Sequence, residues 1–253
     1  MNQNNTFDKH FGNALPPALL VLLSIWLVYW ADSLFIYHFY KLGVLPKSIE
    51  GLQGILFMPL IHSTENLNHI FNNSIPIFLL TLFLFYFYKE IASKIFVLSW
   101  LLTGIGVWLF AANKGAYHIG MSGVIYSLVA FLFTSGTLRK YLPLQALSLF
   151  IAFVYGSLIW GILPISSRIS WEGHFMGLIV GVFLAIIYRK QGPQRPKYIY
   201  EIEKEMGIEP PDLEGQYWQR VKEEEEQKAK EEKTKIIYHM KNQDKDELQN
   251  LIT

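Results

Sequence analysis

The sequence predicts an all-α membrane protein with six transmembrane helices and a charged, helical cytoplasmic tail. Of its 253 residues, 51% are hydrophobic and only 17% are charged, whereas about a quarter are charged in a typical soluble domain. Of the 43 Lys, Arg, Asp and Glu residues, 15 lie before Arg189 and 28 from Arg189 onward. The first three quarters of the chain are therefore suited to a lipid bilayer.

Six apolar segments account for the predicted spans, since a helix needs about 20 mainly apolar residues to cross a bilayer. They are residues 14–37, 67–88, 95–112, 122–136, 142–163 and 174–188. The fourth and sixth are short, and they reach full length only if residues 117–121 and 170–173 also lie at membrane depth. We expect a membrane domain over residues 1–190 and a charged tail over residues 191–253.

Loop charges predict the orientation of these spans. The connections after the second, fourth and sixth spans hold six Lys and Arg residues close to the helix ends, and the other connections hold four. Positive charge favours the cytoplasmic side, so both termini are predicted to be cytoplasmic. Residues 1–13 are polar and do not resemble a secretory signal peptide. We therefore expect a multi-pass protein of a bacterial cell (inner) membrane.

Composition excludes several other kinds of chemistry. The chain has no cysteine, so it has no disulfide framework, thiol nucleophile or cysteine-ligated metal. The net charge of +1 gives no indication of nucleic-acid binding.

Residues 41–66 are partly apolar but contain Gly51, Gly54 and Pro59, so we expect an interfacial element or a loop that caps the bundle. In the tail, Glu and Lys residues four apart favour a solvated helix.

The sequence Gly120-Met121-Ser122-Gly123 opens the fourth apolar segment. A serine at the start of a helix lies among free backbone N–H groups, at the positive end of the helix dipole. Such N–H groups can receive the negative oxygen of a tetrahedral intermediate. The motif makes Ser122 a candidate nucleophile, but taken alone it is weak evidence, and a packing motif with a serine N-cap is then the preferred interpretation.

His174 opens the sixth segment, beside glycines that repeat every four residues at Gly173, Gly177 and Gly181. These glycines form a smooth helix face for close packing. If that face packs against the fourth span, a neutral His174 can accept the proton of Ser122. We expect no acidic residue in the apolar core of a span, so the pair would act as a catalytic dyad without the Asp that completes a Ser–His–Asp triad. The alternative is a histidine that is hydrogen-bonded at a helix interface.

His69 and Asn73 lie four residues apart at the start of the second segment, so they share a helix face. Both side chains can donate hydrogen bonds, and two donors near a catalytic serine complete an oxyanion hole. A polar helix start is the alternative, and it is preferred for Asn72. The second, fourth and sixth spans all begin on the same side, so the three polar clusters are predicted to lie at similar depth.

This pattern resembles the rhomboid family of intramembrane serine proteases over residues 14–188. In that family, His-x-x-x-Asn occurs in the second span, Gly-x-Ser-Gly opens the fourth, and a histidine precedes spaced glycines in the sixth. The matching residues here are His69 and Asn73, Gly120–Gly123, His174 with Gly177 and Gly181, and Tyr126 at a position where an aromatic ring packs on the histidine. The resemblance implies a six-helix rhomboid bundle.

The resemblance also implies an activity, that of a serine endopeptidase (a hydrolase). Ser122 is then the nucleophile and His174 the general base, while the oxyanion hole consists of His69, Asn73 and the Ser122 backbone N–H. Gly120, Gly123, Tyr126 and Gly177 are supporting residues. The partners implied are transmembrane protein substrates in a lipid bilayer, with no cofactor, metal or nucleic acid.

Two other interpretations remain at this stage. One is a catalytically inactive rhomboid-like scaffold that binds membrane proteins, although such relatives usually lose the serine or the histidine. The other is a transporter that uses its histidines as a proton relay. Transporters often contain internal repeats and polar groups at the bilayer midplane, whereas this chain has no evident repeat and its polar groups lie near one surface.

Overall fold

The computed structural model describes the chain except for residues 1–2, 113–114, 165–169, 209–211 and 251–253. Helices make up 79% of the structure, and in the described part β pairing is limited to one isolated bridge between Val44 and His118. The chain divides into two compact units, Met1–Pro196 and Lys197–Thr253. Each unit is described by itself.

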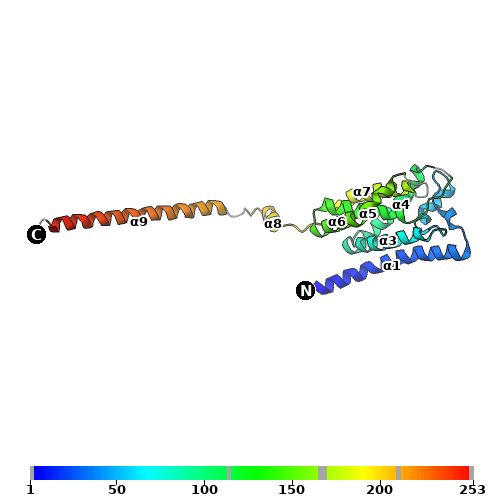
Figure 1. Cartoon of the computed structure of the whole chain (residues 1–253), viewed down its shortest axis with the longest axis horizontal. Coiled ribbons are helices and arrows are strands. Elements are labelled where there is room, and N and C mark those ends of the chain that lie inside the picture. The colour runs from blue at the N-terminus through cyan, green and yellow to red at the C-terminus, as the bar shows by residue number, and fades with distance from the viewer. Residues whose placement is uncertain (1–2, 113–114, 165–169, 209–211, 251–253) are drawn as a thin grey trace. The chain divides into compact units, whose positions relative to one another are not determined.

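The first unit is a helical bundle, as Figure 1 shows. Its long helices are α1 (Gln3–Phe35), α3 (Leu67–Phe87), α4 (Ala92–Phe110), α5 (Ser122–Arg139), α6 (Leu142–Tyr155) and α7 (Trp171–Ile187). Between α1 and α3 lie the short turns η1 (Phe39–Leu42), η2 (Glu50–Gln53), α2 (Gly54–Phe57) and η3 (Met58–Leu60). The 3₁₀ helix η4 (Gly156–Ile162) continues α6, and η5 (Tyr188–Lys190) ends α7.

Five segments of the described chain are long and apolar enough to cross a membrane. They are Phe11–Phe35, Leu67–Phe87, Ala92–Phe110, Leu142–Ile162 and Trp171–Lys190. The predicted all-α membrane fold is confirmed, and the protein is an integral, multi-pass membrane protein. The sixth bundle helix, α5, is not among these five, because it carries several polar and small residues that face neighbouring helices.

Helix α5 is the central helix of the bundle. Twelve of its 18 residues are buried, and it packs against α3, α4, α6 and α7. Its contact with α7 is close because glycines face it: a Cβ at Gly177 would collide with the carbonyl oxygen of Gly123, and a Cβ at Gly181 with that of Ser127. This close approach places the start of α7 beside the start of α5.

Arg139 lies at the C-terminal end of α5, opposite Ser122, and connects it to the residues at the end of α7. Its guanidinium donates to the carbonyl oxygens of Tyr188 (2.8 Å), Gln191 (2.7 Å) and Pro193 (2.8 Å), and its Nε donates to Ser135 Oγ at 2.8 Å. The side chain is 7% exposed. These bonds tie the end of α5 to the segment that follows α7.

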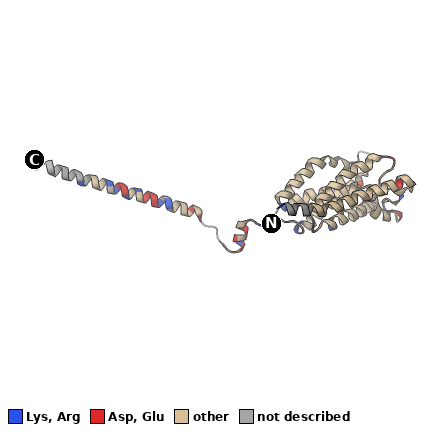
Figure 2. Cartoon of the chain, turned by 90° about the horizontal axis from the view of Figure 1, so that it is seen from below, with Lys and Arg blue, Asp and Glu red and all other residues tan. Residues whose placement is uncertain are grey.

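The second unit holds α8 (Ile199–Glu205) and α9 (Leu213–Asn250). Figure 2 shows Lys, Arg, Asp and Glu along α9, whereas the helices of the bundle are almost free of charge. Lys197 Nζ forms an ion pair with Glu205 at 2.6 Å. A helix with charged residues on most of its surface is suited to water rather than to a bilayer.

Candidate active site

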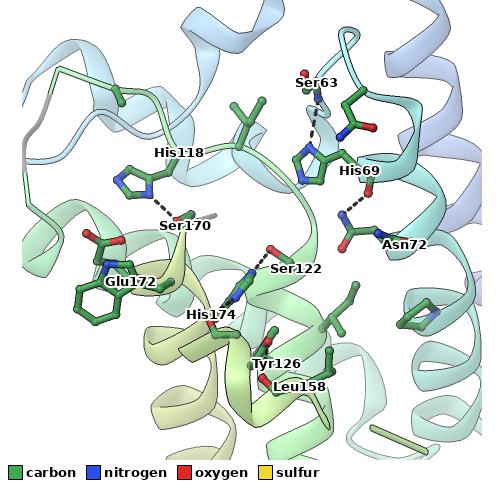
Figure 3. Close-up of a pocket in the computed structure, with 18 of the residues that line it drawn as sticks. Ser63, His69, Asn72, His118, Ser122, Tyr126, Leu158, Ser170, Glu172 and His174 are labelled. Carbon is green, nitrogen blue, oxygen red and sulfur yellow. Dashed lines mark hydrogen bonds between the residues drawn. The ribbon is translucent and has the colours of Figure 1, made fainter. Parts of the chain in front are cut away.

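A cavity of about 1310 Å³ opens beside the first turns of α3, α5 and α7. The residues that line it include Ser122, His174, His69, Asn73 and Tyr126, all of which the sequence had marked as candidates. Figure 3 shows Ser122 and His174 facing each other, with His69 across the cavity. Polar groups from three separate helices therefore meet in one hollow within a mainly apolar bundle.

Ser122 and His174 are joined by a hydrogen bond of 2.8 Å between the serine Oγ and the imidazole Nε2. Ser122 is the first residue of α5, and His174 lies in the first turn of α7. His174 is 8% exposed, and its Nδ1 lies 2.8 Å from the carbonyl oxygen of Gly161 in η4. This is the arrangement of a nucleophile with a general base.

The segment before α5 holds Ser122 in place through its backbone. His118 pairs with Val44 through two N–H···O bonds of 2.8 and 3.0 Å, and the Gly120 N–H donates to the Met58 carbonyl at 2.9 Å. Gly120 has a φ of +111°, where a side chain is strained. A Cβ there would also lie 2.7 Å from His69 Nε2, so glycine is required at this position.

His174 is fixed by an aromatic ring stacked on its imidazole and by the cap of its helix. The Tyr126 ring stacks on the imidazole at a centroid distance of 4.2 Å, and the Tyr126 hydroxyl donates to the Leu158 carbonyl at 2.6 Å. Ser170 caps α7 by accepting a hydrogen bond from the Gly173 N–H at 3.3 Å. The cap and the stack together restrict the rotation of the imidazole.

His69 presents one ring nitrogen to the site. Its Nδ1 accepts a hydrogen bond from the Ser63 N–H at 3.3 Å, so in the neutral ring Nε2 carries the proton. That Nε2 lies over Gly120, two residues before Ser122. Asn73 is 5% exposed, and its Nδ2 donates to the His69 carbonyl at 2.9 Å. One of the two N–H bonds of Asn73 is therefore occupied within α3.

His62 makes a contact that sequence reasoning did not find. Its Nε2 accepts a hydrogen bond from the Met121 N–H at 3.4 Å, and its Nδ1 lies 3.3 Å from the Leu60 carbonyl. The pKa of His62 is lowered to about 3, mainly by burial and also by the nearby His69, while the Leu60 carbonyl acts in the opposite direction. His62 is therefore a neutral acceptor behind Ser122.

A second pair that was not foreseen joins His118 and Ser170. The His118 Nδ1 lies 2.5 Å from Ser170 Oγ, which links the segment before α5 to the cap of α7 (Figure 3). The two residues lie 52 positions apart in the sequence, so no local pattern indicates the contact. Within the part of the chain that the structure describes, no three His, Cys, Asp or Glu side chains are grouped as metal ligands.

Comparison with known proteins gives the same family as the sequence pattern. A model described as "Rhomboid domain" matches residues 49–191, which is more than half of the chain. An uncharacterized protein of Mycobacterium bovis is 33% identical over 168 residues, which cover 60% of this chain and 65% of that protein. An uncharacterized protein of Mycobacterium tuberculosis matches equally well. This chain thus spans about 65% of the length of these relatives.

A third relative is matched over a longer stretch. An uncharacterized protein of Mycobacterium leprae is 27% identical over 202 residues, which cover 77% of each chain. These similarities and the matched domain agree with the helical membrane fold described above. They supply no substrate, because each of these relatives is itself described only as uncharacterized.

Proposed function

The chain belongs to the rhomboid family, and we propose that it is an intramembrane serine endopeptidase that uses Ser122 and His174 as a catalytic dyad. The observation that carries this proposal is the 2.8 Å hydrogen bond between Ser122 Oγ and His174 Nε2. The bond lies in a cavity large enough for an extended peptide segment. A Ser–His pair whose histidine is buried and whose serine faces a cavity is the arrangement that acyl transfer requires.

The proposed reaction has two stages. Ser122 Oγ attacks the carbonyl carbon of a peptide bond while His174 Nε2 takes the serine proton, and the tetrahedral intermediate forms. The C–N bond then breaks, and His174 gives its proton to the leaving amine. Water attacks the resulting ester with His174 again as base, which releases the new carboxylate and restores Ser122.

The negative oxygen of the intermediate needs hydrogen-bond donors already in place. We assign this role to the backbone N–H of Ser122, to the His69 Nε2–H and to the free N–H of Asn73. The start of α5 adds the positive end of a helix dipole. Gly120, Gly123 and Gly177 support the site because their missing side chains allow His69 and α7 to come close.

The proposed substrates are transmembrane proteins. The cavity is lined by residues of helices that cross the membrane, so a substrate segment has to unwind from its own helix at that depth to reach Ser122. Small or helix-breaking residues near the cleaved bond make such unwinding easier. The proposed location is a bacterial inner membrane with both termini in the cytoplasm, as the distribution of loop cations favours.

A fluorophosphonate probe tests the proposal directly, because it reacts with activated serines. The purified protein in detergent and in proteoliposomes is compared with Ser122→Ala, His174→Ala and the control Ser127→Ala. Ser127 lies on the same helix but is buried and bonded to Ser99 at 2.9 Å. We expect labelling of the wild type and of the control only. Thermal melting checks that all four proteins are folded.

The opposite outcome has a clear meaning. A folded wild-type protein that stays unlabelled with several probes and lipid compositions is not a serine hydrolase, and a membrane-protein-binding scaffold then becomes the better assignment. Labelling that survives Ser122→Ala assigns the reactive serine elsewhere. Once labelling is established, candidate transmembrane substrates can be screened by the appearance of cleaved fragments in the same proteoliposomes.

A further inference from the structure

Both ring nitrogens of His174 have a partner, and the two partners differ in kind. Nε2 faces the hydroxyl of Ser122, which can donate or accept a hydrogen bond, whereas Nδ1 faces the carbonyl oxygen of Gly161, which can only accept. In the neutral imidazole, Nδ1 therefore carries the proton. This leaves the lone pair on Nε2, so Ser122 donates to it, as a general base requires.

We propose that the main-chain carbonyl of Gly161 is the positioning group of the dyad, holding His174 in the reactive tautomer and orientation. A buried carboxylate has this role in Ser–His–Asp triads. The inference rests on the proposed serine endopeptidase function and adds to it the group that orients the base. The Gly161 carbonyl faces Nδ1, whereas the proton is exchanged at Nε2, so in this role Gly161 acts through His174.

No side-chain carboxylate takes this place in the described structure. Among the described residues, the buried carboxylate is that of Asp32, which accepts a hydrogen bond from the Phe39 N–H at 3.0 Å near the end of α1. When His174 takes the serine proton, Nδ1–H keeps its bond to Gly161, and the carbonyl dipole stabilises the imidazolium. A neutral carbonyl does this without placing a second charge in the membrane.

The geometry also requires glycine at position 161. A Cβ there would collide with the Tyr126 hydroxyl and lie 3.1 Å from His174 Nδ1. The Tyr126 hydroxyl donates to the carbonyl of Leu158 in the same 3₁₀ helix. Two carbonyl groups of η4 therefore contact the stacked Tyr126 and His174 rings, and a displacement of η4 removes the orienting bond of the base.

Gly161→Ala tests this proposal against a matched control, Gly156→Ala. Both glycines belong to η4, but a Cβ at Gly156 meets nothing within 4 Å. The readout is the rate of fluorophosphonate inactivation of folded protein. We expect Gly161→Ala to lower this rate on the order of 10², the lower end of the contribution of general-base catalysis, and Gly156→Ala to change it less than about twofold. Equal rates in the two variants overturn the proposal.

A second measurement reads the imidazole itself. Nitrogen NMR of ¹⁵N-histidine-labelled protein distinguishes the two neutral tautomers, and His174→Asn identifies the signal. We expect the Nδ1–H form in the wild type and in Gly156→Ala, and a mixture of tautomers in Gly161→Ala. An Nε2–H form in the wild type overturns the inference. This readout needs no activity, so an unlabelled wild type refutes the proposed function while the tautomer still decides the role of Gly161.

If Gly161→Ala does not fold, the proposal is tested instead by replacing one backbone amide with an ester. An α-hydroxy acid at position 162 turns the Gly161 carbonyl into a weaker acceptor without adding atoms near Tyr126. We expect inactivation to slow about fivefold, the equivalent of one weakened hydrogen bond. The control ester at position 160 removes an N–H from the same helix and leaves that carbonyl intact. Equal rates for the two esters contradict the proposal.

Discussion

The phenol ring of Tyr126 lies parallel to the imidazole of His174, with 4.2 Å between the ring centroids and 8° between the ring planes. The two residues come from α5 and α7, and both are buried. The stack prevents the imidazole from turning out of the plane in which it meets Ser122. A catalytic role for His174 therefore depends on a ring that takes no part in proton transfer.

The first prediction separates the ring of Tyr126 from its hydroxyl. Tyr126→Phe keeps the stack and loses the 2.6 Å bond to Leu158, so we expect a loss of activity of about fivefold. Tyr126→Ala also removes the stack, and we expect a loss on the order of 10² because His174 is no longer held. Cleavage rates of a model transmembrane substrate measure both. Equal losses in the two variants would show that the stack has no separate effect.

The second prediction concerns the proposed oxyanion donors. We expect His69→Ala to lower the cleavage rate by about 10² to 10³, the usual effect of removing one donor. Asn73→Ala has a smaller expected effect, on the order of 10, because one of its N–H bonds is already given to the His69 carbonyl. Asn72→Ala is the control, since Asn72 is exposed on the same helix. A larger loss of cleavage rate in Asn72→Ala than in Asn73→Ala would assign the oxyanion role to Asn72 instead of Asn73.

The third prediction is a dependence of stability on pH. The pKa of His62 is lowered by burial to about 3, and the unfolded value is about 6.5. Between these values the unfolded chain binds more protons, so the free energy of unfolding falls as the pH decreases below about 6.5. The contribution of His62 is about 2 kcal/mol smaller at pH 5 than at pH 8.

His62→Gln isolates this contribution, because a neutral amide can still accept a hydrogen bond from the Met121 N–H. Unfolding in detergent is measured at pH 5 and pH 8 for the wild type, for His62→Gln and for the control His239→Gln, an exposed position on α9. We expect the difference between the two pH values to shrink by about 2 kcal/mol in His62→Gln only. An unchanged difference there would mean that His62 is charged in the fold.

The fourth prediction addresses the contact between α5 and α7. A Cβ at Gly177 would collide with the Gly123 carbonyl, so Gly177→Ala moves the helices apart and costs about 1–3 kcal/mol of stability. Labelling of Ser122 falls with it, because His174 lies one turn away on the same helix. Gly12→Ala in α1, where nothing lies within 4 Å, is the control and is expected to be neutral or slightly stabilising. Normal stability of Gly177→Ala would show that the helix contact can adapt.

The fifth prediction concerns the far end of α5. Arg139→Gln removes charge-assisted bonds to three carbonyl groups, and we expect a loss of about 3 kcal/mol in the free energy of unfolding. Lys140→Gln removes the same charge from an exposed neighbour and is expected to change stability by less than about 0.5 kcal/mol. Thermal melting in one detergent compares the two variants. Equal melting temperatures would contradict a structural role for Arg139.

Much of the fold could be predicted, because the length and apolarity of a segment decide whether it crosses a membrane. The second span was expected over residues 67–88, and α3 covers Leu67–Phe87. The start of α7 at Trp171 was less visible, since it depends on the cap that Ser170 provides. Residues 117–121 stay outside α5 because His118 and Gly120 bond to residues of the loop after α1.

The candidate site was predictable only where side chains follow a spaced pattern. Ser122, His174, His69 and Asn73 lie on helices whose order and direction follow from the spans, and their catalytic roles remain predictions. The carbonyl of Gly161 has no signature, because every residue carries one. The bond between His62 and the Met121 N–H joins positions 59 residues apart, and such a contact depends on how the loop after α1 folds over the bundle.

The central position of α5 has a consequence for how the protein enters the membrane. A helix with twelve buried residues, among them Ser127, Ser135 and Arg139, is surrounded by protein rather than by lipid, so its polar side chains need neighbouring helices as partners. We expect α5 to reach its final position only after α6 and α7, which follow it in the chain and pack against it. The residue proposed as nucleophile therefore reaches its final depth only when the helix that carries its base has been synthesised.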